Sequence, residues 1–240
     1  MPMTGNDVVV GPPLRGEWAI WNPPGHAKLA FDFLATSGNR SPYPALTFLR
    51  HVFGSISVAE TYAWNQPVFA PLDGVVVACS DGTADRERIS MIRDLVALLM
   101  FPPEHGSPFP AYGGNYVTLK CGDFYPLFAH LRCGSVCVRV GDHVQAGDML
   151  GRVGNSGSSL QPHLHLQVMS SANPFPLFEN LLPFKLREVR KRTGEEWTEI
   201  STAELRNGDH LCFQEIGEDA RETQVSKLKH DSEHRRSVKE

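Results

Sequence analysis

Two histidines separated by one residue give the sharpest chemical signal of this 240-residue chain, in the Pro-His-Leu-His-Leu run at 162–166. In a β-strand, residues i and i+2 point to the same face, so the imidazoles of His163 and His165 would converge. Leu164 and Leu166 alternate with them, which predicts a half-buried strand with its histidines facing a groove. Converging imidazoles favour a metal site, although a His-x-His pair is also common on half-exposed strands that bind nothing.

A second candidate pair is His26 and Asp32, in the sequence Gly-His-Ala-Lys-Leu-Ala-Phe-Asp. Their separation of six residues is even, which would keep both side chains on one face of a strand. Imidazole nitrogens and one carboxylate oxygen suit zinc, and three protein ligands leave a fourth position open, as in catalytic sites. The alternative is that Asp32 caps a turn or pairs with Lys28.

A third histidine, His130, ends the apolar segment Phe-Ala-His-Leu just before the turn at Cys133. By itself such a histidine has a structural explanation. His143, His51, His105, His210, His230 and His234 have no motif around them. Tyr62 and Trp64 suit either core packing or a substrate groove.

The elements that must position these residues are short strands, because Gly and Pro divide the chain into segments rich in Val, Leu, Phe and Tyr. Expected strands are residues 27–34, 67–69, 74–80, 116–121, 125–131, 151–153, 163–169, 184–192 and 210–214. One helix is expected at residues 85–100, where Ile89, Ile92, Val96 and Leu99 recur at helical spacing. Residues 35–64 show only weak periodicity.

Composition places the chain among ordinary globular proteins, with 41% hydrophobic residues and a formal net charge of -4. Acidic and basic residues are interspersed, so nucleic acid is not an expected partner. The five cysteines cannot all pair within the chain, and we expect them to be small buried or half-buried residues. The N-terminus shows no secretory signal, and no segment approaches the roughly 20 apolar residues needed to span a bilayer.

In chain order, five segments resemble the lysostaphin-type (LytM-like) zinc metallopeptidases, a family of peptidoglycan endopeptidases. They are residues 65–77, 114–119, 125–131, 138–153 and 154–166, of which the last is the most specific. The resemblance extends over residues 25–168 and leaves two insertions, 35–64 and 82–113. It implies a mainly β fold, an antiparallel β-sandwich of the duplicated hybrid motif type, with one inserted helix.

The resemblance places His26, Asp32 and His165 at the family's zinc ligands. It places His130 and His163 at its two active-site histidines that do not bind the metal. It therefore implies one Zn²⁺ per chain and peptide hydrolysis by an activated water, with His163 as the proton carrier and His130 stabilising the tetrahedral intermediate. The family's first motif usually places the histidine four residues before the aspartate, so the interval of six makes His26 the least secure ligand. A β-bulge, or a ligand on the loop that enters the strand, would restore the geometry.

The resemblance also gives an expected organisation. Residues 1–24 would form an N-terminal segment, 25–182 the peptidase domain, 183–216 a β extension packed on it, and 217–240 a charged, disordered tail. The two insertions would wall the active-site cleft. We expect a monomer acting on peptide or peptidoglycan outside the cytoplasm, although without a visible export signal a cytoplasmic location stays open.

Two other interpretations compete with this one. Residues 138–153 also resemble the hairpins of biotin and lipoyl carrier domains, but no lysine lies between Lys120 and Lys185 to carry the cofactor. A degenerate member of the peptidase family would instead bind cell wall or activate another hydrolase. The retention of all five site positions argues against that alternative.

Overall fold

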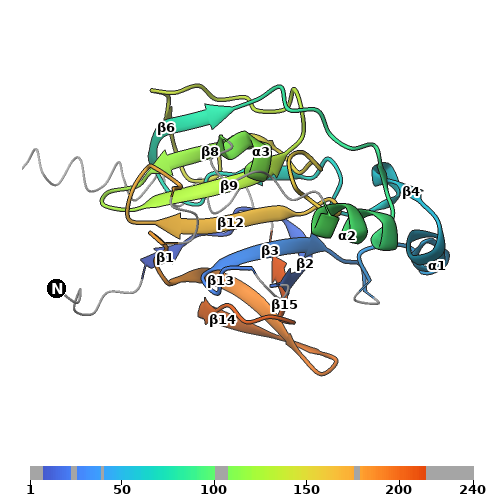
Figure 1. The fold of residues 1–240 in the computed structure, drawn as a ribbon. Helices are drawn as coiled ribbons and strands as arrows, with labels where there is room; N and C mark the ends of the chain where they lie inside the picture. Colours follow the sequence, from blue (N-terminus) through green and yellow to red (C-terminus); the bar gives the residue numbers. More distant parts are fainter. Residues whose placement is uncertain (1–7, 23–25, 39–40, 101–107, 176–178, 215–240) are drawn as a thin grey trace, which may run out of the picture.

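An eleven-stranded sheet dominates the computed structural model of the protein, which describes residues 8–22, 26–38, 41–100, 108–175 and 179–214 (Figure 1). In order across the sheet, its strands are β1 (Val8–Val10), β13 (Phe184–Thr193), β15 (His210–Phe213), β2 (Gly16–Trp21), β3 (Ala30–Ala35), β12 (Leu164–Met169), β9 (Tyr125–Leu131), β8 (Asn115–Lys120), β6 (Gly74–Ser80) and β10 (His143–Val144). Strand β14 (Glu196–Glu204) pairs with β13. Among the described residues, β1 and β13 are the only parallel pair.

Smaller elements complete the fold. Strand β5 (Pro67–Phe69) pairs with β11 (Met149–Arg152), and β4 (Ile56–Ser57) pairs with β7 (Arg88–Ile89). The helices are α1 (Ala45–Phe53), the 3-10 helix η1 (Val58–Glu60), α2 (Met91–Met100) and α3 (Phe109–Gly113). The predicted mainly β class is confirmed, and the described residues hold three α-helices where the sequence predicted one.

The central strands β3, β9 and β12 are buried on both faces, which gives each face a different role. Alternate side chains such as Phe33, Leu164 and Leu166 enter the main hydrophobic core. The residues between them, including Asp32 and His165, face the other way. Period-2 alternation therefore places the main core on one face and Asp32 and His165 on the other, which also carries a smaller apolar cluster of Phe109, Leu127, Ala129 and Met169.

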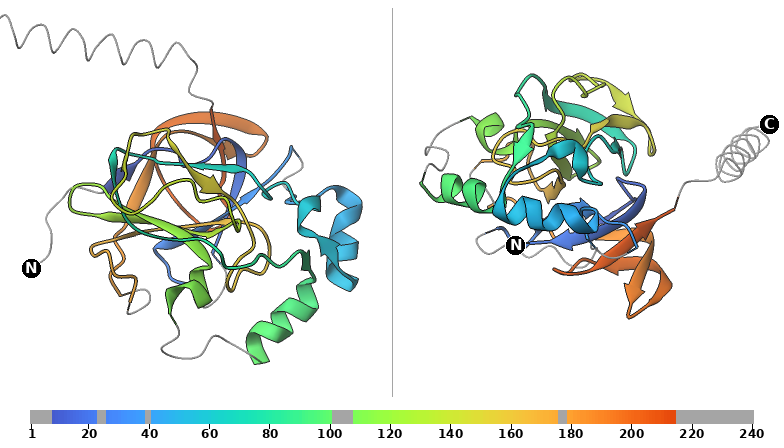
Figure 2. Two further views of the ribbon diagram at one scale, coloured as in Figure 1. Left: turned by 90° about the horizontal axis from the view of Figure 1, so that it is seen from above. Right: turned by 90° about the vertical axis from the view of Figure 1, so that its right-hand side faces the viewer.

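Parts of the two insertions form one lobe, whereas α3, at the end of the second insertion, packs on the main sheet. Strand β4 from the first insertion pairs with β7 from the second. Helices α1 and α2 lie side by side at one end of the molecule (Figure 2). A small core of their own lies beneath, and its members are Tyr43, Ile56, Val58 and Ile89, with Trp64 packed against them. We call this unit the insertion lobe.

Helix α2 differs from the predicted helix at residues 85–100 in two respects. It begins at Met91, because Arg88 and Ile89 belong to β7. Ile92, Val96 and Leu99 are exposed instead of packed. The helix is tied to the lobe through buried Asp94, whose carboxylate accepts a hydrogen bond from the Ser90 amide (2.8 Å) and an ion pair from Arg86. The helix thus turns its predicted apolar face outward and Asp94 inward.

The segments that flank the central strands extend the same sheet. Strand β2 pairs with β3, and β15 connects β2 to the hairpin of β13 and β14. The predicted charged tail at 217–240 lies outside the described residues. None of the described helices is long and apolar enough to cross a membrane.

The five cysteines are unpaired. Cys121 is buried, and Cys79 and Cys212 are half-buried, as expected. Cys133 and Cys137 are exposed, so the expectation of burial is wrong for these two. They lie in the turn segment after β9.

Candidate metal centre

Asp32 and His165 face each other at the centre of the sheet. They are directly paired across the antiparallel strands β3 and β12, and the Nδ1 atom of His165 lies 2.9 Å from the Oδ1 atom of Asp32. Both side chains are buried. The register of two adjacent strands therefore places these two residues opposite each other.

His26 reaches the same carboxylate from a turn. Its Nε2 atom lies 3.5 Å from Asp32 Oδ1 and 3.2 Å from His165 Nδ1. The prediction that His26 and Asp32 share a strand face is wrong, because β3 begins only at Ala30 and a turn closed by the Ala30 amide on the Ala27 carbonyl intervenes (3.2 Å). This turn takes up the additional residues of the six-residue interval and brings the imidazole back toward Asp32.

The turn is held by Asn22, a residue that the sequence did not single out. Its side-chain amide donates to the carbonyl oxygens of both Ala27 and Ala30, each at 3.0 Å. The Ala27 carbonyl also accepts from Nδ1 of His26 (3.2 Å). Asn22 opens an Asn-Pro-Pro-Gly sequence, which signals a turn but not a link to the site.

His130 is aimed at the site by a β-bulge. Asn115 pairs with Leu131 and Val117 with Phe128, so β9 has one more residue than β8 over this interval. His130 is the extra residue and has a φ of 61°, in the left-handed region that non-glycine residues rarely adopt. Strict alternation from Phe128, a core residue, would have sent His130 into the core, and the bulge sends Leu131 there instead.

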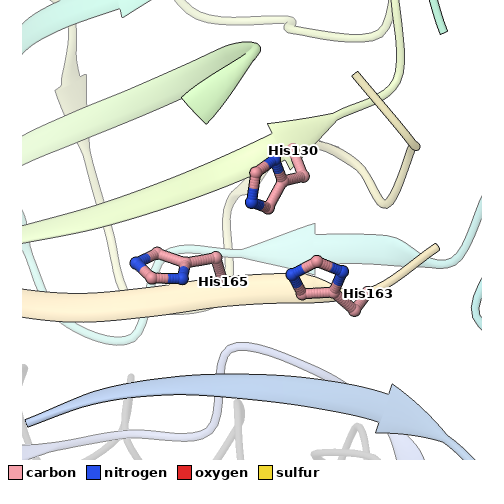
Figure 3. A group of neighbouring side chains, drawn as sticks. All are labelled: His130, His163 and His165. Carbon is pink, nitrogen blue, oxygen red and sulfur yellow. The ribbon is translucent and has the colours of Figure 1, made fainter. Parts of the chain in front are cut away.

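Three histidines gather between β9 and β12 (Figure 3). The ring centroids of His130 and His163 are 4.7 Å apart, and those of His130 and His165 are 5.8 Å apart. The Nε2 atom of His163 lies 3.4 Å from Asp32 Oδ1, so His163 and His165 both face the carboxylate, as their i, i+2 spacing predicted. All five residues that the sequence selected therefore lie in one cluster.

Hydrogen bonds to carbonyl groups determine which ring nitrogens face the cluster. A carbonyl oxygen only accepts, so the ring nitrogen beside it must carry the proton. His130 donates from Nδ1 to Ser156 (2.9 Å), and His163 donates from Nδ1 to Gln161 (2.7 Å). Both rings consequently present Nε2 as the atom for chemistry. The hydroxyl of Ser159 also donates to the Gln161 carbonyl (2.7 Å).

The same reasoning applies to the two histidines nearest Asp32. His26 donates from Nδ1 to Ala27, which leaves the lone pair of Nε2 facing Asp32. His165 Nε2 lies 3.1 Å from the Oε1 atom of Gln167, so it donates there and Nδ1 carries the lone pair. Two imidazole lone pairs and a carboxylate oxygen thus converge, an arrangement of acceptors that a cation satisfies.

The three converging atoms have the separations that a zinc site requires. The distances among His26 Nε2, Asp32 Oδ1 and His165 Nδ1 are 2.9, 3.2 and 3.5 Å. Tetrahedral ligands at the usual zinc distances lie about 3.3 Å from one another. The donor set of two nitrogens and one oxygen is also one that zinc accepts. The residues present therefore fit zinc, and they form a group of potential metal-binding atoms.

Burial and mutual contact shift the pKa values of the cluster in opposite directions. Burial by itself would raise the pKa of Asp32, but the neighbouring imidazoles of His163 and His165 hold it well below its usual range. Burial lowers the pKa of His26, which Asp32 only partly offsets. Burial, together with His163 and His165, holds the pKa of His130 well below its usual value. Burial by itself would lower the pKa of His163, but the charge of Asp32 and the hydrogen bonds to Asp32 and Gln161 raise it. Asp32 is therefore an anion at the centre of the cluster, which suits a cation.

The loop at residues 154–157, which holds His130, is packed without space to spare. A Cβ atom on Gly114 would lie 2.2 Å from Ser156 Oγ, and one on Gly157 would lie 2.4 Å from the Gly114 amide nitrogen. The side chain of Asp85 accepts from the amides of Asn155 (2.7 Å) and Cys133 (2.8 Å). Motif spacing gives no sign of Asp85, because its contacts depend on an inserted segment far away in the sequence.

Parts of the chain are similar to known peptidases. Residues 103–176 match the model of peptidase family M23. Over 84 residues the chain is 31% identical to the peptidoglycan DD-endopeptidase ShyA of Vibrio cholerae serotype O1, which covers 35% of this chain and 19% of that protein. Over 72 residues it is 33% identical to lysostaphin of Staphylococcus simulans, which covers 30% of this chain and 15% of that protein. The chain thus spans about a fifth or less of these relatives.

Among solved structures, the catalytic domain of lysostaphin from Staphylococcus simulans is similar over 73% of this chain and 91% of that chain, with 19% identity and a TM-score of 0.34. The catalytic domain of the M23 protein EnpA from Enterococcus faecalis is similar over 69% of this chain and 88% of that chain, with 16% identity and a TM-score of 0.38. The family model and the sequence relatives support a lysostaphin-type M23 peptidase family for this chain.

Proposed function

We propose that the protein is a zinc-dependent metalloendopeptidase that hydrolyses peptide bonds in the cross-links or stem peptides of bacterial peptidoglycan. The observation that carries the proposal is the convergence of His26 Nε2, Asp32 Oδ1 and His165 Nδ1 at 2.9 to 3.5 Å. The peptidoglycan substrate is inferred from relatives such as the DD-endopeptidase, which this chain matches over part of their length.

In this proposal, His26, Asp32 and His165 hold the metal. Zinc with three protein ligands supplies Lewis acidity toward a peptide carbonyl and toward water. Asp32 supplies the negative charge, and Gln167 fixes the orientation of the His165 ring through the bond to Nε2. Peptide is the expected substrate, and action outside the cytoplasm is part of the proposal.

His163 is the proposed proton carrier. Its Nδ1 proton is engaged by the Gln161 carbonyl, so proton exchange takes place at Nε2, the atom that faces Asp32 at 3.4 Å. A neutral imidazole in this tautomer takes a proton from water and returns it to the leaving amine. The ring is buried beside the ligands, as a general base must be to reach the reacting water.

The proposed role of His130 differs from the one expected from the sequence. Its bond to Ser156 places the proton of the neutral ring on Nδ1, and Nε2 is then an acceptor. Donation to an oxyanion would need a second proton, which burial opposes. We therefore propose that His130 accepts a hydrogen bond at Nε2 and orients water or substrate beside His163.

Zinc binding and peptide hydrolysis by the full chain test the function. We expect about one zinc per chain by metal analysis, loss of that zinc in Asp32→Ala, and unchanged zinc in His143→Ala, whose imidazole is exposed on β10. Purified peptidoglycan fragments should be cleaved by the zinc-loaded protein and not after chelation. Zinc binding without cleavage of any fragment would favour the alternative of a non-catalytic family member, and no zinc binding would refute the metal site.

A further inference from the structure

The insertion lobe is connected to the proposed proton carrier by a chain of hydrogen bonds. Tyr43, from the first insertion, donates its hydroxyl proton to the side-chain Oε1 atom of Gln161. The backbone carbonyl of the same Gln161 accepts the Nδ1 proton of His163 at 2.7 Å. Tyr43 is thus linked to the His163 imidazole through Gln161, although Tyr43 and Gln161 lie 118 positions apart in the sequence.

Tyr43 is well placed to act as a fixed point. Its side chain is 2% exposed and packs with Ile56, Val58 and Ile89 in the core of the insertion lobe. The ring also contacts His51 edge to face, with centroids 5.0 Å apart. Burial raises its pKa, so the hydroxyl keeps its proton and acts as the donor to Gln161. Strands β4 and β7 thus anchor the tyrosine from both insertions.

Gln161 is well placed to connect the position of Tyr43 to the orientation of His163. It precedes Pro162, and a residue before proline is confined to extended backbone conformations. With the backbone restricted and the side chain held by Tyr43, its carbonyl has a fixed direction. Two donors use that carbonyl: the Ser159 hydroxyl at 2.7 Å and His163 Nδ1 at 2.7 Å.

We propose that Tyr43 is a positioning residue for His163, holding Gln161 so that its carbonyl fixes the orientation and tautomer of the imidazole. The proposal rests on the proposed function, because it takes His163 as the proton carrier. It gives the insertion lobe a role in the reaction, the positioning of His163, that does not require contact with the substrate. Tyr43 itself touches neither the metal ligands nor, in this proposal, the reacting atoms.

The test is Tyr43→Phe in the zinc-loaded full chain, which keeps the ring in the lobe core and removes only the hydroxyl. We expect kcat for a peptidoglycan fragment to fall about five- to tenfold, the scale of one lost hydrogen bond, with KM changed less than about twofold. Gln161→Met should have a similar effect. Because both residues act through one link, the double variant should be no slower than the slower single variant.

A spectroscopic measurement decides the proposal independently of activity. In protein labelled with ¹⁵N-histidine, the Nδ1 proton of His163, assigned with His163→Gln, should give a downfield resonance protected from exchange with water. Tyr43→Phe should shift it or broaden it by exchange, whereas Val58→Ala, which loosens the same core but keeps the hydroxyl, should not. An unchanged resonance in Tyr43→Phe, or an equal change in Val58→Ala, overturns the proposal, even if wild-type protein cleaves no peptide and the proposed function fails.

Discussion

His165 Nδ1 lies 2.9 Å from Asp32 Oδ1, and the two residues are register partners on adjacent antiparallel strands. Backbone pairing keeps the two residues opposite each other, and the bond of His165 to Gln167 orients the ring toward Asp32. Only His26 comes from a turn, and its position depends on bonds that a single substitution can remove. The preformed part of the site is thus on the strands, and its adjustable part is the turn before β3.

The Asn22 side chain should control the affinity of the site for metal. Asn22→Ala removes both donors that hold the carbonyls of Ala27 and Ala30, so the His26 ring loses its fixed turn. We expect zinc binding to weaken about tenfold in competition with a chelating dye, as for other outer contacts of metal ligands. Asn207→Ala is the matched control, because the Asn207 side chain accepts from the backbone amide of Asn22 (3.0 Å), whereas the Asn22 side chain holds the turn. Equal weakening in both variants would show that the turn is not responsible.

Gln167 should hold the ring of His165. Gln167→Leu removes the acceptor of the Nε2 proton and leaves a buried ring free to change tautomer, so zinc affinity should fall about 10- to 100-fold. In Met169→Leu, Gln167 loses its contact with the sulfur (3.1 Å) but keeps His165, and zinc affinity should stay within about twofold of wild type. The two titrations can be compared directly. A wild-type affinity in Gln167→Leu would contradict the assigned role.

Two glycines with the same backbone conformation should respond differently to alanine. Gly157 and Gly122 have φ values of 66° and 63°, but a Cβ on Gly157 would lie 2.4 Å from the Gly114 amide nitrogen and one on Gly122 would contact nothing. Gly122→Ala should therefore lower the free energy of unfolding by about 1 kcal/mol, the cost of the left-handed conformation. Gly157→Ala should lower it by about 3 kcal/mol, because overpacking is added.

Urea denaturation measures both changes in free energy, and activity separates them further. Gly157→Ala displaces the loop whose Ser156 carbonyl holds His130, so peptide hydrolysis should fall even under conditions where the variant is folded. Gly122→Ala should retain wild-type hydrolysis. Equal losses of stability at the two positions would mean that the loop is less tightly packed than its contacts indicate.

The cysteines should differ sharply in reactivity. Burial raises the pKa of Cys121 to about 11, so about one molecule in a thousand carries its thiolate at pH 8. Cys133 is exposed to solvent. Iodoacetamide at pH 8 should label Cys133 rapidly and Cys121 only after denaturation, as measured by mass spectrometry of peptides. Labelling of Cys121 in folded protein at the rate of Cys133 would show that this part of the core opens.

Strand positions followed well from local sequence. The bounds predicted at 67–69, 74–80 and 125–131 coincide with β5, β6 and β9, because turn residues delimit each apolar segment. Helix α1 and the short strands β4 and β7 were not predicted. Their stability comes from pairing between distant insertions, which no local pattern records.

The site was predictable as a set of residues and not as a geometry. Motif order brought together His26, Asp32, His130, His163 and His165, which the fold places in one cluster. The even spacing wrongly placed His26 on the strand of Asp32, and the alternative of a ligand on the entering loop is the one that agrees with the turn at Ala27. Strand alternation also could not predict the bulge at His130. Three supporting residues were not predicted, because their contacts are with groups that carry no sequence signal. Asn22 binds backbone carbonyls, Asp85 binds backbone amides, and Tyr43 binds the side chain of Gln161.

The pairing of β4 with β7 has a consequence for how the insertion lobe can be altered. Each insertion contributes one strand of a two-stranded ribbon and part of the core beneath it, with Ile56 from one and Ile89 from the other. Excising either one leaves an open strand edge and half a core in its neighbour. The two insertions therefore form a single structural unit, and we expect natural sequences to gain or lose them together.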